Sequence, residues 1–204
     1  MVNKDTSLYG SFSSNPGNNG CIFFNNLFKK NKINAIYKSF YSDNLKQSIN
    51  SAKNLNFKGF ALSMPFKIEI LQYLDESEEA VNIIGACNTV KIQNNKLKGY
   101  NTDWVGAYKY LKNLDIKSLT ILGNGGFSKS VQYACDILNI TTDIIERNQW
   151  NLVPQLKGII FNCTPVEVST KGLLIDGRPS TPKGREIALL QAKEQYKIYI
   201  NEIS

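Results

Sequence analysis

The sequence predicts an α/β fold, because apolar strand-like runs alternate with segments of helical periodicity along most of its 204 residues. A second observation is the run Ile-Leu-Gly-Asn-Gly-Gly at 121–126, where an apolar strand passes through a glycine turn into a helix. A third is a change of pattern around residues 104–113. Together these features predict an N-terminal α/β domain followed by a smaller, Rossmann-like nucleotide-binding domain.

The elements of the first hundred residues follow from periodicity and turn residues. An Asn-, Pro- and Gly-rich turn at 15–20 precedes a helix that Asn18 or Asn19 caps. Pro65 ends an apolar strand, because proline cannot donate to a sheet ladder. In chain order we expect a helix at 21–28, a strand at 34–40, a helix at 44–54, a strand at 59–64, a helix at 68–74 and an acidic helix start at 75–80. Strands at 89–93 and 96–100 form a hairpin around an Asn-Asn pair that tolerates positive φ.

The second half of the chain reads as strand-helix-strand. Thr102 or Asp103 caps a helix that runs through residue 111. Beyond it we expect a strand at 118–122, a helix at 128–138, strands at 142–146 and 158–163, and a C-terminal helix at 186–199. This alternation predicts a parallel sheet. The last helix is expected to return to the first domain.

Composition narrows the classes of protein. With 42% hydrophobic and 20% charged residues the chain resembles an ordinary globular protein. It has no run as long as a membrane span and no apolar signal stretch, so the expected compartment is the cytoplasm. Scattered lysines produce the net charge of +7, so we expect neither a nucleic-acid nor a membrane partner. A diffuse positive field suits small anionic ligands. The plainer explanation of the scattered lysines is an ordinary solvated surface.

The four cysteines form no CxxC pattern, which argues against a zinc site, so no metal is expected. Their apolar neighbours predict reduced core thiols.

The glycine turn is a candidate phosphate site. The glycines within 123–126 let the backbone approach a pyrophosphate, and the helix start at 127–128 offers N–H donors at the positive end of its dipole. Arg147 follows the next strand, where a cation suits a 2′-phosphate, whereas the neighbouring Glu146 suits a 2′-hydroxyl. We therefore expect NADP, with NAD possible. A tight turn that binds nothing is the alternative explanation.

The chain contains no histidine, so proton chemistry falls to Lys, Asp, Glu, Tyr or Cys. Lys67 ends the run Ser-Met-Pro-Phe-Lys, and Asp103 ends the run Gly-Tyr-Asn-Thr-Asp. Taken singly, Lys67 is a solvated lysine, Asp103 a helix cap and Asn88 a turn residue. Their joint presence around one inferred cleft indicates a site instead.

These motifs resemble the shikimate dehydrogenase family in order and spacing, over about residues 8 to 200. The runs that carry the resemblance are 63–67, 84–89, 99–103 and 122–126. The loop at 15–20 with Phe24-Asn25 is similar to the shikimate-dehydrogenase-like branch, in which a glycine-containing loop replaces a pair of serines. Gly184 followed by Leu-Gln-Ala at 190–192 resembles the closing substrate-side helix of the family.

The resemblance implies an NADP-dependent alcohol dehydrogenase that reversibly reduces 3-dehydroshikimate to shikimate, or acts on a related cyclic hydroxy acid. That step belongs to chorismate and aromatic amino acid biosynthesis. Lys67 matches the catalytic lysine, which donates a proton to the ketone oxygen, and Asp103 matches its partner. The substrate-binding residues implied are Asn88, Thr89 and Gln191, with Asn18 near the first of the family's paired serines and Ser13 just upstream. The cofactor-binding residues implied are Gly123, Asn124, Gly125, Gly126, Phe127, Ser128, Arg147 and Thr164.

The implied domains are a substrate-binding catalytic domain at 1–103, a shortened NADP-binding domain at 104–184 and a returning helix at 185–204, in a monomer or homodimer. The chain departs from the family in its missing serine pair. It is also shorter between Arg147 and 161 and between 164 and 184, where only Asp176 and Pro179 remain of an Asp-x-x-Tyr-x-Pro stretch. The alternative is therefore a non-catalytic small-molecule-binding or regulatory homologue that has lost its cofactor.

Overall fold

The computed structural model describes residues 2–200, and the chain divides into two compact units. The first unit comprises Met1–Asn101 together with Gln195–Ser204, and the second comprises Thr102–Glu194. One long helix, α7 (Pro182–Tyr199), contributes residues to both units. The α/β fold class predicted from the sequence is confirmed.

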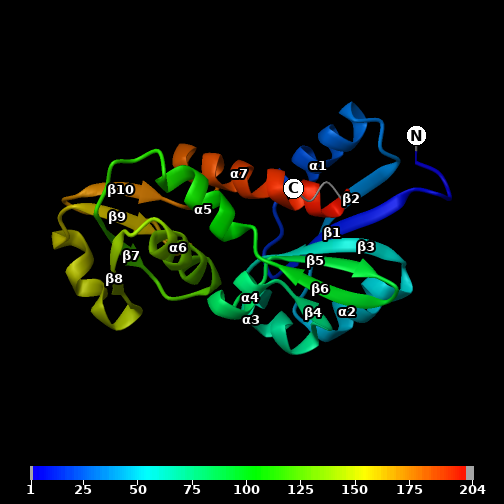
Figure 1. The fold of residues 1–204 in the computed structure, drawn as a ribbon, viewed down its shortest axis with the longest axis horizontal. Helices are drawn as coiled ribbons and strands as arrows, with labels where there is room; N and C mark the ends of the chain where they lie inside the picture. Colours follow the sequence, from blue (N-terminus) through cyan, green and yellow to red (C-terminus); the bar gives the residue numbers. More distant parts are fainter. Residues whose placement is uncertain (1, 201–204) are drawn as a thin grey trace. The chain divides into compact units, whose positions relative to one another are not determined.

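A six-stranded mixed sheet forms the first unit, in the order β2-β1-β3-β5-β6-β4 (Figure 1). Strands β1, β2 and β3 are parallel, whereas β5 pairs antiparallel with both β3 and β6. The strands are β1 (Ser7–Ser13), β2 (Ala35–Tyr41), β3 (Phe57–Leu62), β4 (Glu76–Ser77), β5 (Thr89–Gln93) and β6 (Lys96–Tyr100). At the β5–β6 turn, Asn94 and Asn95 adopt φ of 51° and 62°, which confirms the predicted hairpin.

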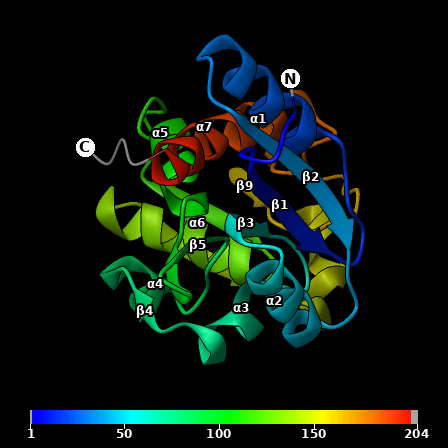
Figure 2. The same ribbon diagram turned by 90° about the vertical axis from the view of Figure 1, so that its right-hand side faces the viewer.

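Helices cover both faces of this sheet because side chains alternate along its strands. Tyr9 contacts Phe28 of α1, with ring centroids 5.5 Å apart, and Tyr199 at the end of α7, with centroids 4.8 Å apart. Phe12 points to the opposite face and packs in a core with Leu45 of α2. Figure 2 shows α1 and α2 on opposite sides of β1. The helical elements are α1 (Asn19–Lys30), α2 (Leu45–Asn54), α3 (Phe66–Glu69), η1 (Ile70–Tyr73, 3₁₀) and α4 (Glu79–Ile84).

The second unit is built on a four-stranded, all-parallel sheet in the order β10-β9-β7-β8 (Figure 1). Its strands are β7 (Ser118–Leu122), β8 (Thr141–Ile145), β9 (Ile159–Asn162) and β10 (Leu173–Asp176). Its helical elements are α5 (Asp103–Leu111), α6 (Gly126–Ile137), η2 (Arg147–Gln155, 3₁₀) and the first part of α7. Ile121 and Phe161 from the sheet are fully buried in one core with Val131 of α6.

Several local predictions are corrected by the structure. The helix expected at 68–74 is a single α-turn followed by a 3₁₀ turn, and three elements, β1, η2 and β10, occupy stretches where no element was predicted. Asn18 and Thr102 stand at the N-cap positions of α1 and α5, but neither side chain makes a capping hydrogen bond. Within residues 2–200, the helices are too short or too polar to cross a membrane.

Candidate functional site

Four chain segments meet at one edge of the first sheet. Strands β1 and β3 are parallel, so both end at this edge. Strand β5 is antiparallel to β3 and therefore begins there, and β6 ends there. The edge thus collects the segments at 13–14, 63–67, 88–89 and 100–101. Three of the sequence motifs converge for this topological reason.

Lys67 lies in the turn after β3, and backbone hydrogen bonds hold that turn from two sides. The Ser63 amide donates to the Phe12 carbonyl at 3.2 Å, and the Cys87 amide donates to the Lys67 carbonyl at 2.7 Å. The Lys67 side chain is half-buried. The lysine is therefore fixed relative to β1 and to the segment that leads into β5.

Asn88 and Thr89 are buried at the start of β5, with exposures of 3% and 0%. The Leu62 amide donates to the Asn88 carbonyl at 2.8 Å. The Thr89 hydroxyl donates to Asn88 Oδ1 at 3.0 Å and accepts from Gln195 Nε2 at 2.7 Å. Gln195 was not among the residues predicted from the sequence, because nothing in the helical pattern of α7 separates it from other polar positions.

Ser13 and Asn18 occupy different surroundings. Ser13 is buried at the end of β1, and its carbonyl accepts from the Ser42 amide at 2.9 Å. Asn18 is exposed in the loop before α1. Asn101 has a structural contact in its turn, since its Nδ2 donates to the Ala86 carbonyl at 2.9 Å. This edge of the sheet therefore brings Ser13 together with Lys67, Asn88 and Thr89.

Asp103 and Gln191 are neighbours within the second unit. Asp103 is 4% exposed in the first turn of α5, where the positive end of the helix dipole favours a carboxylate. The adjacent Thr102 hydroxyl donates to Gln191 Oε1 at 3.0 Å. A Cβ at Gly106 would lie 2.9 Å from Gln191 Cβ, so α5 and α7 touch there. The pairing of Lys67 with Asp103 joins residues of the two units and stays a prediction.

The predicted glycine turn follows β7 and leads into α6. Gly123 adopts a φ of +94°, and its amide donates to the Ile145 carbonyl at 2.9 Å. Gly125 is exposed at the N-cap of α6, and a Cβ added there would meet nothing within 4 Å. The Ser128 hydroxyl donates back to the Gly123 carbonyl at 2.6 Å. The turn is thus braced from inside while its outer backbone is open, as a pyrophosphate would require.

Glu146 and Arg147 follow β8 at the same sheet edge. The Glu146 carboxylate accepts from Asn124 Nδ2 at 2.7 Å and from the backbone of Gln149, as part of a capping box at the start of η2. Arg147 is exposed beside it. Because Glu146 already makes local hydrogen bonds, Arg147 is better placed than Glu146 to contact a substituent on the ribose of a nucleotide.

Thr164 follows β9 and is held by Asn162, which is fully buried. Asn162 Oδ1 accepts from the Thr164 amide at 3.0 Å and from its hydroxyl at 2.7 Å. The Thr164 methyl group would lie 2.9 Å from a Cβ at Gly123, so this loop packs on the glycine turn.

Burial acts to raise the pKa of Asp176, but hydrogen bonds from Arg178 outweigh it and hold that pKa below its ordinary value.

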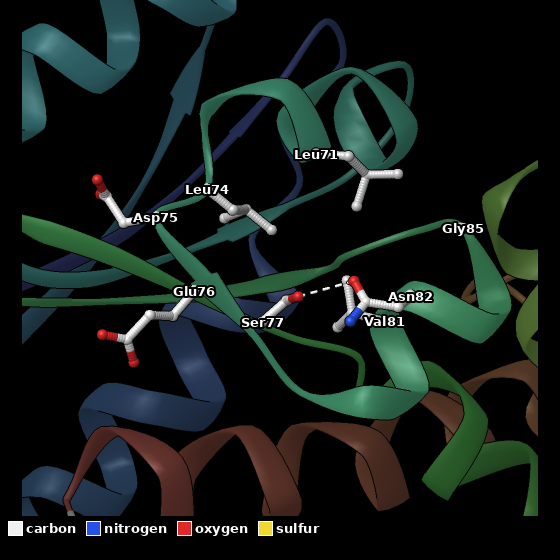
Figure 3. A pocket seen from close by; sticks show the side chains of 8 residues that line it. All are labelled: Leu71, Leu74, Asp75, Glu76, Ser77, Val81, Asn82 and Gly85. Atoms are coloured by element: carbon white, nitrogen blue, oxygen red, sulfur yellow. Dashed lines mark hydrogen bonds between the residues drawn. The ribbon is translucent and has the colours of Figure 1, made fainter.

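A separate cavity of about 250 Å³ lies in the first unit beside β4 and α4 (Figure 3). Its lining residues are Leu71, Leu74, Asp75, Glu76, Ser77, Val81, Asn82 and Gly85. Ser77 Oγ donates to Asn82 Oδ1 at 2.8 Å, and Asp75 Oδ2 accepts from the Leu97 amide at 2.7 Å. These polar groups support local structure, and none of the residues predicted for the site lines the cavity. Within residues 2–200, no group of three or more His, Cys, Asp or Glu residues could hold a metal ion.

Comparison with known proteins identifies relatives of the whole fold. The family model of the shikimate dehydrogenase substrate binding domain matches residues 20–90. A shikimate dehydrogenase (NADP(+)) of Methanococcus vannielii is 42% identical over 123 residues, which are 57% of this chain and 43% of the relative. The enzyme of the same name from Clostridium botulinum is 34% identical over 202 residues, which are 86% of this chain and 73% of the relative.

A solved structure of the shikimate 5-dehydrogenase-like protein HI0607 superposes with a TM-score of 0.79 at 26% identity, covering 98% of this chain and 94% of that one. The branch suggested by the N-terminal loop is therefore represented among the matches. In sequence, the chain spans about half the length of the first curated relatives, from 43% to 55%.

Proposed function

The chain belongs to the shikimate dehydrogenase family, and from that premise we propose that it is an NADP-dependent oxidoreductase. Its reaction would be the reversible reduction of 3-dehydroshikimate to shikimate or of a related cyclic hydroxy acid. We assign the first unit to the substrate and the second to the cofactor. We further propose that it acts in the cytoplasm as a monomer or homodimer.

One observation carries the proposal: Lys67 and the buried Asn88-Thr89 pair meet at the same sheet edge. The hydrogen bond between the Cys87 amide and the Lys67 carbonyl, at 2.7 Å, fixes their relation. A ketone reduction needs a proton donor at the oxygen and polar groups that orient the neighbouring hydroxyls. An ammonium and a buried side-chain amide supply both functions.

In this proposal the Lys67 ammonium gives its proton to the carbonyl oxygen, and it regains one in the reverse direction. The chemistry that NADPH would supply, when held at the glycine turn, is a hydride for the carbonyl carbon. Asn88 and Gln191 hold substrate hydroxyls, with Ser13 and Asn18 as further contacts. The family motif assigns Asp103 as the partner of the lysine.

The residues around the glycine turn fit the cofactor. The open backbone at Gly125 and the N-terminus of α6 suit a pyrophosphate, because exposed N–H groups and the helix dipole attract its charge. Asn124, Gly126, Phe127 and Ser128 complete that turn. The exposed Arg147 suits a 2′-phosphate, which favours NADP, and Thr164 supports the turn from β9.

The test is reduction of NADP⁺, followed by absorbance, with shikimate and quinate in parallel. Lys67→Ala is expected to lower turnover by about 10²–10⁴-fold, the usual contribution of a general acid, while substrate binding persists. Lys58→Ala is the matched control, because Lys58 is an exposed lysine of β3 whose ammonium donates, among the residues that the structure describes, to Asn56 Oδ1 alone.

Wild-type turnover by the Lys67→Ala variant would overturn the assignment of the acid. Calorimetric titration with NADPH and NADH separates the proposal from its rival. Failure to bind either nucleotide would refute the oxidoreductase function and favour the non-catalytic binding homologue.

A further inference from the structure

A buried asparagine lies at the end of β9, at the carboxyl edge of the second sheet. Asn162 is the last residue of that strand and is fully buried. Its Oδ1 accepts hydrogen bonds from the Thr164 amide at 3.0 Å and from the Thr164 hydroxyl at 2.7 Å. Its Nδ2 donates to the Val166 carbonyl at 2.8 Å and to Asp176 Oδ1 at 3.4 Å. All the acceptor and donor positions of this side-chain amide are therefore occupied.

Backbone groups fix the direction in which the Asn162 amide faces. The Thr164 amide can only donate, so it requires the oxygen end of the side chain. The Val166 carbonyl can only accept, so it requires the nitrogen end. A turned amide would place like groups against each other on both sides. Asn162 therefore has one orientation, and the loop at 163–166 is folded around it.

The loop has few other supports. Among the described residues, the Thr164 hydroxyl otherwise makes hydrogen bonds only with the Val166 backbone, as a donor at 3.5 Å and as an acceptor at 3.3 Å. The Val166 carbonyl is itself held by Asn162. The Cys163 amide donates to the Leu122 carbonyl at 3.1 Å, which fixes where the loop leaves the sheet but not the residues after it. The conformation of the loop therefore depends on one buried side chain.

This loop lies beside the glycine turn, on the side away from β8. The parallel strands stand in the order β10-β9-β7-β8, so the loops that follow β8, β7 and β9 are successive along one edge. The proposed sites of the 2′-phosphate and of the pyrophosphate follow β8 and β7. A dinucleotide that occupies both would extend its nicotinamide half over the end of β9. The Thr164 methyl group, 2.9 Å from a Cβ built at Gly123, brings the loop against the turn there.

We infer that Asn162 is a positioning residue, which holds the loop at 163–166 against the glycine turn so that the loop meets the nicotinamide half of the cofactor. The inference rests on the proposed function, because it specifies how the second unit receives that half of NADPH. Since Asn162 is fully buried, it acts through Thr164 and not by contact with the nucleotide.

The experiment compares two nucleotides by calorimetric titration. They are NADPH and adenosine 2′,5′-bisphosphate, which lacks the nicotinamide half. Asn162→Leu keeps the approximate size of the side chain, adds no charge and removes its hydrogen bonds. It is expected to weaken NADPH binding by about five- to tenfold, the effect of one net hydrogen bond, and to change the Kd of the bisphosphate by less than about twofold. A merely structural role would weaken the binding of both nucleotides alike.

Asn113→Leu is the matched control. Asn113 is an exposed asparagine of the same unit, and its Nδ2 donates to the Lys109 carbonyl at 3.0 Å. It lies in the segment that leads into β7, whereas the glycine turn follows β7, so the two stand at opposite edges of the sheet. The control variant is expected to bind both nucleotides with wild-type affinity.

Thermal unfolding shows whether each variant is folded at the temperature of the titration. If Asn162→Leu does not fold, Thr164→Val loosens the same contact from the side of the loop. It is expected to weaken NADPH binding by about two- to fivefold and to leave the affinity for the bisphosphate unchanged. Equal losses for the two nucleotides, or wild-type NADPH affinity, would overturn the inference. A wild-type chain that binds neither nucleotide would refute the proposed function itself, and the inference with it.

Discussion

Two glycines of the turn after β7 are expected to respond oppositely to the same substitution. Gly125 has φ of −88° and ψ of −177°, an extended conformation open to any residue, and an added Cβ would meet nothing within 4 Å. Gly123 has φ of +94°, and its added Cβ would lie 2.9 Å from the Thr164 methyl carbon. Alanine therefore fits the folded protein at the first position and not at the second.

The expected magnitudes follow from these geometries. Gly123→Ala is expected to cost about 2 kcal/mol for the left-handed conformation and the methyl contact, which lowers Tm by about 4–8 °C for a chain of this size. Gly125→Ala is expected to change stability by less than about 0.5 kcal/mol, because reduced unfolded-state freedom offsets the poorer N-cap. If a pyrophosphate lies on that backbone, the Gly125 methyl group displaces it from at least one charge-assisted hydrogen bond. That loss is about 1.5–3 kcal/mol, or roughly ten- to a hundredfold in Kd.

The assay combines thermal unfolding with calorimetric titration of NADPH. Gly125→Ala is expected to retain the wild-type Tm and lose NADPH affinity, whereas Gly17→Ala, at another open glycine in the first unit, is expected to retain both. NADPH affinity equal to wild type in the Gly125 variant would refute the assignment of the turn to the cofactor. A Gly123 variant as stable as wild type would show that the left-handed conformation at this glycine carries no strain for alanine.

Three further outcomes are expected. The Tyr199 hydroxyl is buried with no hydrogen-bond partner among the described residues. Tyr199→Phe is therefore expected to stabilise the protein by up to about 1 kcal/mol, measured by denaturant titration. A clear loss of stability would contradict this. Hydrogen bonds from Arg178 lower the pKa of Asp176 in the folded protein. The ionised carboxylate therefore stabilises the fold fully above the unfolded pKa of about 4, and this contribution is lost as pH falls through the lower, folded pKa. Asp176→Asn is expected to flatten the acid limb of the stability-against-pH profile. Arg147→Ala is expected to lower NADPH affinity about tenfold and leave NADH affinity unchanged, which calorimetry with both nucleotides checks.

The sequence predicted the long, strongly patterned elements because burial fixes their periodicity. Strand β9 reads Ile-Ile-Phe-Asn and is largely buried, and the hairpin at 89–100 has its Asn-Asn turn. Two of the missed elements, β10 and η2, are short and depend on local contacts. Strand β10 has four residues next to a glycine that packs against the backbone of residue 158, and η2 contains a proline and little apolar periodicity.

The start of α7 shows how a pattern of apolar residues can misplace a helix boundary. The predicted helix began at 186, where apolar residues recur at helical intervals. In the structure, α7 begins at Pro182, and the Gly184 amide donates to the Thr181 hydroxyl at 3.1 Å. A Cβ at Gly184 would clash with the Arg178 carbonyl, so close packing requires glycine there. The Thr-Pro pair, a cap followed by a first-turn proline, was the available signal.

The site divides in the same way into residues with a sequence signature and residues without one. Lys67 and Asn88 lie in segments whose ends are set by strand order, so topology brings them together once the strands are known. Gln195 has no such signature, since it stands four residues after Gln191 on one helix and looks the same in the pattern. What distinguishes the two glutamines is the partner each meets, Thr102 for Gln191 and Thr89 for Gln195. A hydroxyl that already donates to Asn88 cannot also donate to a substrate, and only the three-dimensional order of donors reveals that.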